Sequence, residues 1–222
     1  GMLESRFGPL EVLDCSEFGA RTDDFLSHSD RQITACFPDV FTGEAIEPKR
    51  TLVIWTMGGN DLLSIGDAAQ SGDGQAALLE ALDSVVEYQR AALAFFKDQA
   101  DILFPAGVDV VFTNNYDFTD GTGDFGSCPT AAMIGIDYQI SSWAIGYLAI
   151  NEAYMEMAVE TGTDMVFLME HFCGHGFRSD DPENGCYKGP DTPLYFDPSC
   201  IHPTPEGHRA LATLFDQVIA GD

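Results

Sequence analysis

The sequence predicts an α/β protein in which helices cover both faces of a parallel sheet. Three apolar runs, at residues 51–57, 108–114 and 164–169, have the composition of strands that are buried on both faces. Long segments with apolar residues at helical spacing separate these runs and follow the last one. Because strands that alternate with helices form βαβ units, we expect the three strands to pair in parallel.

The composition predicts a single domain over residues 1–222, since 222 residues with a hydrophobic share of 45% suffice for one sizeable core. The chain has 36 acidic and 10 basic residues, which gives a net charge of -26. Such a surface repels phosphate backbones and anionic membranes, so nucleic acid is excluded as a partner. No apolar run is long enough to predict a membrane span.

The first half of the chain is expected to begin with a short strand at residues 10–14, followed by a helix that opens at Asp23-Asp24. Residues 37–50 contain two prolines and one glycine and are predicted to form a loop. The first buried run ends abruptly at Gly58-Gly59-Asn60-Asp61. A loop with three further glycines then leads to a long helix over residues 75–104.

The second half is expected to contain two more helices and two long loops. A glycine-rich loop at residues 115–129 follows the second buried run, and one helix is predicted over residues 131–161. A long loop rich in glycine and aspartate runs from the third strand to Asp197, and the final helix is predicted over residues 205–219.

The cysteines indicate disulfides. An even number of them, scattered through the loops of an acidic protein, favours an exported protein. Six cysteines allow 15 disulfide connectivities. We favour the connectivity that has two local pairs, which leaves the remaining two cysteines as the third pair. The three pairs are Cys15–Cys36, Cys173–Cys186 and Cys128–Cys200. We therefore expect a secreted, extracellular protein. The sequence contains no signal peptide, so we expect its natural N-terminus to be missing.

A candidate catalytic histidine, His202, precedes the last helix. Pro203 and Pro205 restrict the backbone around it, Thr204 is a suitable N-cap, and Pro205 suits the first helical position. The histidine is thus held on a stiff loop, with the acid Asp197 five residues upstream, which suits a general base and its orienting carboxylate. The structural alternative is a loop histidine beside a terminal helix.

A candidate oxyanion-stabilising residue, Asn60, follows the first buried strand. The glycines before it allow a tight turn and close approach of a ligand, and its amide is a neutral hydrogen-bond donor. Gly-Asn is also common in ordinary turns. However, Asn114-Asn115 and His171 follow the other two strands, and working residues of parallel sheets gather at the carboxyl ends of the strands.

In combination, these motifs resemble the SGNH (GDSL-type) hydrolases, a family of esterases and lipases. Gly58-Gly59-Asn60-Asp61 matches the family's Gly-x-Asn-Asp block, and His202-Pro203 matches the block of the catalytic histidine. Residues 14–22 resemble the block whose glycine, here Gly19, donates its backbone N–H to the oxyanion. Residues 14–22 and residues 171–175 resemble the corresponding segments of the exported, disulfide-bonded lipases of actinobacteria.

The resemblance implies a three-layer α/β/α sandwich with a flavodoxin-like parallel sheet, and acyl transfer through a serine. His202 would be the general base, Asp197 its orienting acid, and Gly19 and Asn60 the oxyanion donors. The implied substrate is a small-molecule ester, either a lipid or an acylated glycan, and no cofactor is implied. The alternative function is a non-catalytic SGNH-like module that binds an acyl or glycan ligand.

One departure from the family concerns the nucleophile, because the first block, a strand that ends in Gly-Asp-Ser, is absent from this sequence. We therefore expect a domain without the family's first strand, and little or no activity. Residues 10–14 would take the vacant place in the sheet and bring Ser16 near the nucleophile's position, or a second copy would cover the gap in a homodimer. A Gly-Asp-Ser strand in the coding sequence upstream would favour the enzyme over the binding module.

The other departure concerns the acid of the triad. The family places an aspartate three residues before the histidine, and this sequence has Ser199 there. A two-residue insertion in the loop would still bring Asp197 to the far imidazole nitrogen. Alternatively, a backbone carbonyl would orient the ring.

Two groups of side chains have the chemistry of metal ligands, but neither predicts a metal site. They are His171, Cys173, His175 and Cys186, and the aspartates Asp117, Asp120 and Asp124. The first group matches no common zinc spacing, and cysteines of exported proteins usually pair. The second is out of register with an EF-hand loop, so a solvated loop rich in glycine and aspartate is the better interpretation.

Overall fold

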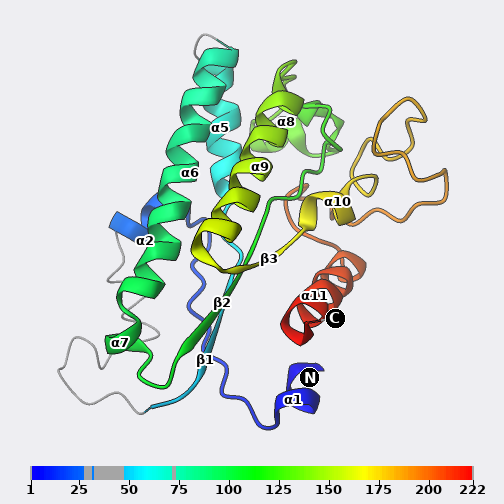
Figure 1. Ribbon diagram of the computed structural model, residues 1–222. Helices are drawn as coiled ribbons and strands as arrows, with labels where there is room; N and C mark the ends of the chain where they lie inside the picture. Colours follow the sequence, from blue (N-terminus) through cyan, green and yellow to red (C-terminus); the bar gives the residue numbers. More distant parts are fainter. Residues whose placement is uncertain (1, 28–31, 33–47, 72–73, 222) are drawn as a thin grey trace.

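The computed structural model describes residues 2–27, 32, 48–71 and 74–221. Its sheet contains three strands in the order β1-β2-β3, and both pairs are parallel (Figure 1). The strands are β1 (Thr51–Trp55), β2 (Val108–Thr113) and β3 (Asp164–Val166). The parallel α/β class predicted from the sequence is therefore confirmed, and each strand lies within a predicted apolar run.

Helices flank this sheet, with α6 and α9 on one side of the strands and α11 on the other (Figure 1). The helical elements within the described residues are α1 (Met2–Phe7), α2 (Thr22–Ser27), α5 (Gly59–Ser71), α6 (Gln75–Asp98), α7 (Ala100–Leu103), the 3-10 turn η1 (Phe125–Ser127), α8 (Ala131–Ile134), α9 (Trp143–Thr161), α10 (Leu168–Phe172) and α11 (Pro205–Ala220). None of these helices is both long enough and apolar enough to cross a bilayer.

The core forms between α6, α9 and the strands because α6 repeats apolar residues every three or four positions. Leu78, Leu82 and Leu93 on α6 are buried. Trp55, the last residue of β1, packs edge-on against Phe96 and donates its ring N–H to Gln89 at 3.0 Å. A buried indole N–H thus finds a partner, as aromatic donors in cores usually do.

The prediction of a strand at residues 10–14 is wrong. These residues have no strand pairing in the structure, and Val12 is 82% exposed. They therefore do not fill a place in the sheet. β1 is an edge strand of the described sheet, and its Leu52 and Ile54 side chains are exposed. A strand of five residues with apolar side chains on only one face buries little apolar surface. Such a segment therefore does not form a strand unless another element packs against that face.

Three of the predicted helical and loop segments also differ from the structure. The segment after Asp61, predicted as a glycine-containing loop, is helix α5, because Leu62, Ile65 and Ala69 pack into the core at helical spacing. Glycine suits position 66 of this helix, since a Cβ there would lie only 3.0 Å from the Tyr138 hydroxyl.

The predicted helix over residues 131–161 is interrupted. Gly135, with a φ of +78°, ends α8. The chain then returns to residues 123–124, where Ile140 N–H donates to the Gly123 carbonyl at 3.0 Å. Only afterwards does α9 begin, at Trp143. Long-range pairing therefore overrides a helical periodicity that continues through the sequence. A shorter interruption at Gln99 separates α6 from α7.

The final helix matches its predicted start. Thr204 accepts a hydrogen bond from Gly207 N–H at 3.1 Å, and Pro205 occupies the first turn. The disulfides Cys128–Cys200 and Cys173–Cys186 are present as predicted. The predicted pair Cys15–Cys36 involves Cys36, which lies outside the described residues.

Candidate active site

The turn that leaves β1 requires glycine. Gly58 has a φ of +136°, which side-chain-bearing residues rarely adopt, and a Cβ there would lie 2.4 Å from Asn115 Oδ1. Helix α5 begins at the next residue, Gly59, so that Asn60 stands in its first turn, half-buried. The Gly-Gly-Asn-Asp motif is therefore a turn at the carboxyl end of β1, as predicted, but it leads into helix α5 rather than into the predicted loop.

Hydrogen bonds join this turn to the segment around Gly19. Asn60 Nδ2 donates to the Ala20 carbonyl at 3.0 Å. The buried Asp61 carboxylate accepts from Thr22 N–H and from the Thr22 hydroxyl, both at 3.1 Å. Burial raises the pKa of Asp61 above its usual value, and the Thr22 bonds partly oppose this. Two segments about 40 residues apart in the chain are thereby held side by side.

Gly19 and Asn60 each retain a hydrogen-bond donor. Gly19 is exposed with a φ of +78°, in a turn closed by Ala20 N–H donating to the Glu17 carbonyl at 3.2 Å. Within the described part of the chain, no group accepts from the Gly19 N–H. Asn60 uses one of its two amide N–H groups on Ala20, so one remains. The two predicted oxyanion donors thus lie in adjoining turns.

His202 stands on a short loop that closes on itself. Phe196 and Pro203 form an antiparallel bridge, and Asp197 N–H donates to the His202 carbonyl at 2.9 Å. Within the loop, Cys200 N–H donates to the Asp197 carbonyl at 2.9 Å. Cys200 has a φ of +73°, which is unfavourable for a residue with a side chain, and its disulfide to Cys128 holds it in place.

The side chains of this loop form a chain of hydrogen bonds. Asp197 Oδ1 accepts from both the backbone N–H and the hydroxyl of Ser199. The Ser199 hydroxyl oxygen lies 2.8 Å from Nδ1 of His202. Asp197 therefore reaches the imidazole through Ser199 rather than directly. The ring is exposed, and among the described residues Ser199 is its hydrogen-bond partner.

Both segments border the chain that leaves β2. Asn115, two residues after β2, contacts the Gly58 turn, and the next residue, Tyr116, donates its hydroxyl to the Ile201 carbonyl at 3.3 Å. Burial raises the pKa of Tyr116 to about 12, so its hydroxyl remains a donor. The Asn60 turn and the His202 loop consequently lie along the same carboxyl edge of the sheet.

Ser16, the candidate nucleophile, is engaged locally. Its hydroxyl donates to Asp14 Oδ1 at 2.6 Å, and its backbone N–H donates to the same oxygen at 3.0 Å. The side chain is exposed and lies on the segment that forms no strand. In the described structure no hydrogen bond joins Ser16 to His202, so nothing in this arrangement activates its oxygen.

The aspartates of the loop after β2 are buried hydrogen-bond centres rather than a solvated group, so that interpretation is wrong for Asp117 and Asp120. Asp117 accepts from the Thr119 hydroxyl at 2.7 Å and from Trp143 Nε1 at 2.8 Å. Asp120 accepts from three backbone N–H groups of the loop after α10. Burial raises the pKa of Asp120 to about 6, against the effect of those bonds. Asp124 pairs with Arg178.

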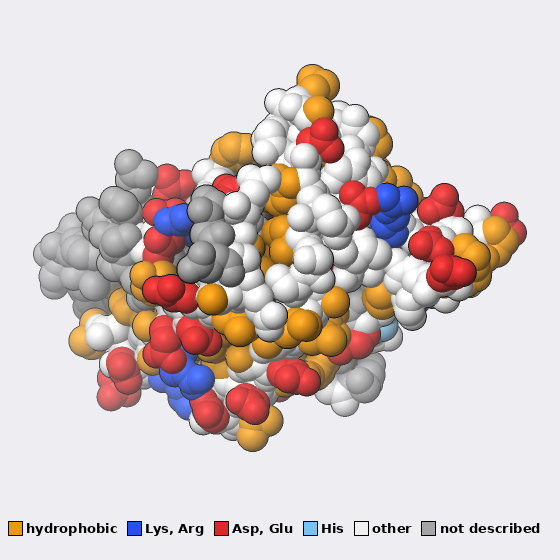
Figure 2. Space-filling model, turned by 90° about the horizontal axis from the view of Figure 1, so that it is seen from above, with side chains coloured by type: hydrophobic (Ala, Val, Ile, Leu, Met, Phe, Trp, Pro, Cys, Tyr) orange, Lys and Arg blue, Asp and Glu red, His pale blue; other side chains and the backbone are white. Residues whose placement is uncertain are grey.

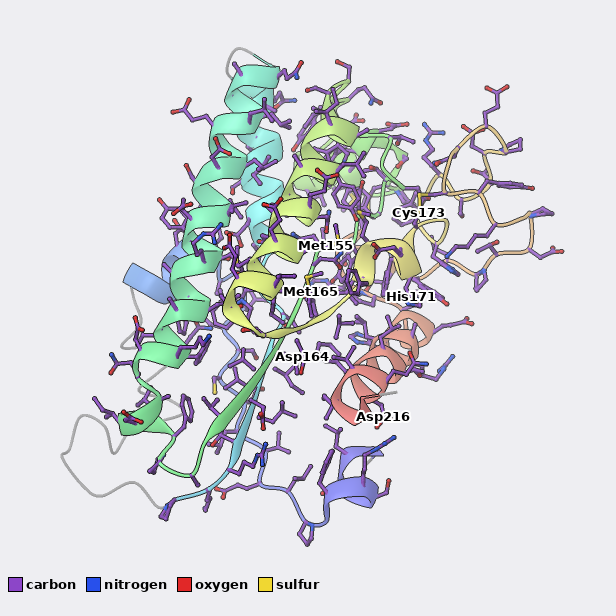
Figure 3. The ribbon with its side chains drawn as sticks, viewed as in Figure 1. Met155, Asp164, Met165, His171, Cys173 and Asp216 are labelled. Carbon is purple, nitrogen blue, oxygen red and sulfur yellow. A yellow bond between two sulfur atoms is a disulfide. The ribbon has the colours of Figure 1, made fainter. Side chains whose placement is uncertain are left out.

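A cavity of about 300 Å³ lies between α11 and α10, the helix that carries His171. His171 is labelled in Figure 3. His171 and His175 line the cavity together with Lys188 and Tyr195. His175 stacks on Tyr195 with ring centroids 3.7 Å apart, and its Nδ1 is 2.7 Å from the Pro193 carbonyl. Cys173 and Cys186 are joined in a disulfide, so neither can be a thiolate ligand.

Comparison with known proteins found no matching family model and no matching curated protein. Similar solved structures were found, and three of them follow. The extracellular lipase from Streptomyces rimosus has 21% identity and a TM-score of 0.49, over 90% of this chain and 77% of that chain. The acetyl xylan esterase AlAXEase has 15% identity and a TM-score of 0.49, over 89% and 75%. Phospholipase A1 from Streptomyces albidoflavus NA297 has 17% identity and a TM-score of 0.49, over 90% and 77%.

Proposed function

We propose that this chain carries the base and the oxyanion-binding donors of an SGNH-type ester hydrolase. The observation that carries the proposal is the hydrogen bond from Asn60 Nδ2 to the Ala20 carbonyl, because it holds the Gly19 turn and the Asn60 turn together. Within the described ranges, each turn has one N–H group without an acceptor. His202, with its Nδ1 already bonded, borders the same edge of the sheet.

In this mechanism a serine oxygen attacks an ester carbonyl while Nε2 of His202 takes the serine proton. The negative charge on the former carbonyl oxygen is held by the Gly19 N–H and by Asn60 Nδ2. His202 then returns the proton to the leaving alcohol, and water hydrolyses the acyl intermediate. We propose a small ester, either a lipid or an acylated glycan, as the substrate.

Among the described residues, no serine hydroxyl is hydrogen-bonded to Nε2 of His202. Ser199 contacts the His202 ring at Nδ1. The attacking hydroxyl of the proposed mechanism would instead be hydrogen-bonded to Nε2. The Ser16 hydroxyl is bonded to Asp14. Loss of the serine of a triad lowers turnover by a factor of about 10⁶ and leaves a residual rate about 10³- to 10⁴-fold above water, which comes from binding and the oxyanion hole.

We therefore expect this chain to hydrolyse p-nitrophenyl esters only at a small residual rate. Because the members of a triad act as a unit, His202→Ala should change that residual rate little. Asn60→Ala should lower it by up to about 10²- to 10³-fold, since it removes an oxyanion donor. Release of p-nitrophenol, measured against buffer, gives each rate.

His208→Ala, which changes an exposed histidine on α11, is the matched control and should leave the rate unchanged. A rate typical of intact ester hydrolases that is lost in both Ser16→Ala and His202→Ala would show that Ser16 is the nucleophile after all. A rate above buffer that Asn60→Ala leaves intact would contradict the oxyanion assignment.

The binding module remains the second candidate, because the free donors of Gly19 and Asn60 are present while Ser16 is engaged by Asp14. In that case the chain would bind an acyl or glycan ligand without turning it over. A hydrolysis rate equal to buffer, together with shifts of the Gly19 amide signal on titration with a short-chain acylated sugar, would support it.

We further propose that the protein acts outside the cell. The disulfides Cys128–Cys200 and Cys173–Cys186 persist in oxidising compartments and are rare in reducing ones. Detection of the protein in the culture medium rather than in the cell pellet of its host would test this.

A further inference from the structure

The hydroxyl of Ser199 lies between a carboxylate and an imidazole. Its oxygen contacts Asp197 Oδ1 on one side and lies 2.8 Å from His202 Nδ1 on the other. Asp197 and Ser199 are half-buried, and the loop that carries all three residues is closed by the bond from Asp197 N–H to the His202 carbonyl. The arrangement is therefore built into one short loop.

The protons available to these groups determine which group donates in each of the two hydrogen bonds. An ionised carboxylate only accepts, so the single proton of the Ser199 hydroxyl goes to Asp197. The hydroxyl oxygen then has only lone pairs to offer to the ring. His202 Nδ1 must consequently be the donor in the remaining contact, and in the neutral ring Nε2 is left with a free lone pair.

We propose that Ser199 is a positioning residue that links the Asp197 carboxylate to His202 and holds the ring in the Nδ1–H tautomer. This inference rests on the proposed function for its catalytic meaning, because that tautomer presents Nε2 as the base. In a triad with a directly bonded aspartate, the carboxylate sets the tautomer itself. Here a serine stands three residues before the histidine, and the acid lies two residues further upstream.

The hydroxyl is not needed to close the loop. The backbone bonds from Ser199 N–H to Asp197 Oδ1 and from Cys200 N–H to the Asp197 carbonyl remain without it. The Cys128–Cys200 disulfide also remains. Removing the hydroxyl therefore changes the partner of the ring while the loop keeps its other restraints, which separates a positioning role from a structural one.

The test is the tautomer of His202, read from the two ring ¹⁵N chemical shifts of the neutral imidazole in the folded chain. The signals are assigned by their disappearance in His202→Ala. We expect the wild-type ring to carry its proton mainly on Nδ1. In Ser199→Ala the ring loses its acceptor, and the proton should move mainly to Nε2. Ser199→Thr keeps a hydroxyl and should restore the wild-type tautomer.

Ser16→Ala is the matched control for this measurement, because Ser16 makes the same two bonds to an aspartate two residues upstream but bonds no histidine among the described residues. It should leave the His202 signals unchanged. A wild-type ring protonated mainly on Nε2, or a Ser199→Ala ring that keeps the wild-type tautomer, would overturn the proposal.

These outcomes are independent of ester hydrolysis, because the ring is observed without substrate. If the tautomer behaves as expected while Asn60→Ala leaves hydrolysis unaffected, the proposed function fails and the positioning role of Ser199 stands. If Asn60→Ala lowers the rate while the tautomer does not respond to Ser199→Ala, the proposed function stands and the positioning role of Ser199 fails.

Discussion

At the scale of single residues, the clearest electrostatic feature is Asp120. This residue is 4% exposed, and its carboxylate accepts hydrogen bonds from the backbone N–H groups of Gly174, Gly176 and Arg178. It also adopts a φ of +52°, a region that aspartate and asparagine tolerate better than most residues. One side chain thus anchors the loop after α10 to the loop after β2.

Asp120 should make the protein less stable as the pH rises. Burial raises its pKa in the folded state from 3.8 to about 6, so between these values the folded state binds the proton more tightly than the unfolded chain. The stabilising contribution is complete below about pH 4 and is lost as the pH rises to about 6. A shift of this size corresponds to about 3 kcal/mol.

Asp120→Asn should therefore show a shallower fall in unfolding free energy between about pH 4 and about pH 6, as measured by urea unfolding at several pH values. The variant should be less stable overall, because its amide faces the Arg178 N–H. Asp98→Asn, which changes an exposed carboxyl at the end of α6, alters the net charge equally and is the control. Parallel pH profiles for Asp120→Asn and wild type would contradict the prediction.

At the scale of elements, the strand-to-helix turn at Gly58 decides where Asn60 stands. Gly58→Ala would introduce a side chain at a φ of +136° and bring its Cβ within 2.4 Å of Asn115 Oδ1. We expect a loss of about 1–3 kcal/mol in unfolding free energy from the strained backbone. The Asn60 turn should also move, so the shift of the Asn60 side-chain amide signal is a second measurement.

Gly59→Ala is the matched control for this prediction. Gly59 begins α5 and is not at a positive φ, and a Cβ there would meet no atom within 4 Å. Alanine there should be neutral or slightly stabilising, because it favours the helix over the unfolded chain. Equal losses of stability for Gly58→Ala and Gly59→Ala would show that the backbone at Gly58 is not the cause.

Also at this scale, the Cys128–Cys200 disulfide attaches the His202 loop to a distant segment. Cys200 belongs to that loop, and Cys128 follows the 3-10 turn η1. The bond spans 72 residues, so it restricts the unfolded chain strongly. The Thr130 hydroxyl, which donates to the Pro198 carbonyl at 2.6 Å, adds a second connection between the same segments. The His202 loop is thus attached to the segment around Cys128 at two points.

At the scale of the whole molecule, the charge is the dominant feature. Acidic side chains are spread over the face shown in Figure 2, with few basic ones among them. The net charge of -26 makes the compact state repel itself, and salt screens this repulsion, since the Debye length falls from about 10 Å at 0.1 M to about 3 Å at 1 M.

We therefore expect the midpoint of thermal unfolding at neutral pH to rise as NaCl increases from about 0.1 M to about 1 M. Calorimetry at each salt concentration measures it. The same titration near the sequence pI of about 4.1 should raise the midpoint less, because the net charge is then close to zero. A salt response of equal size at both pH values would mean that general charge repulsion is not responsible.

Local patterns in the sequence predicted much of the fold. The apolar runs indicated the three strands, and Thr204-Pro205 indicated the start of α11. Two of the wrong predictions share one cause. The interruption before α9 and the exposure of residues 10–14 depend on whether a distant segment pairs with or covers the chain, and a short window of sequence contains no information on that.

The candidate site divides in the same way. Turn chemistry and the proline pattern singled out Asn60 and His202, because glycine and proline act within a few residues of themselves. The sequence could place Asp197 near His202 but not assign the contact to Ser199, since that depends on how the loop closes. The burial of Asp117 and Asp120 was missed because aspartate among glycines is common in exposed loops.

By itself, then, the sequence determined the class of fold, the three strands, the start of the last helix, and the turns that carry the candidate donors and base. Only the tertiary structure decided which polar groups meet, such as Asn60 with Ala20 and Asp120 with Gly174, at separations of 40 and 54 residues. The reason is physical: propensity and turn geometry act over a few neighbouring residues, whereas a buried polar group is satisfied by whatever the folded chain brings beside it.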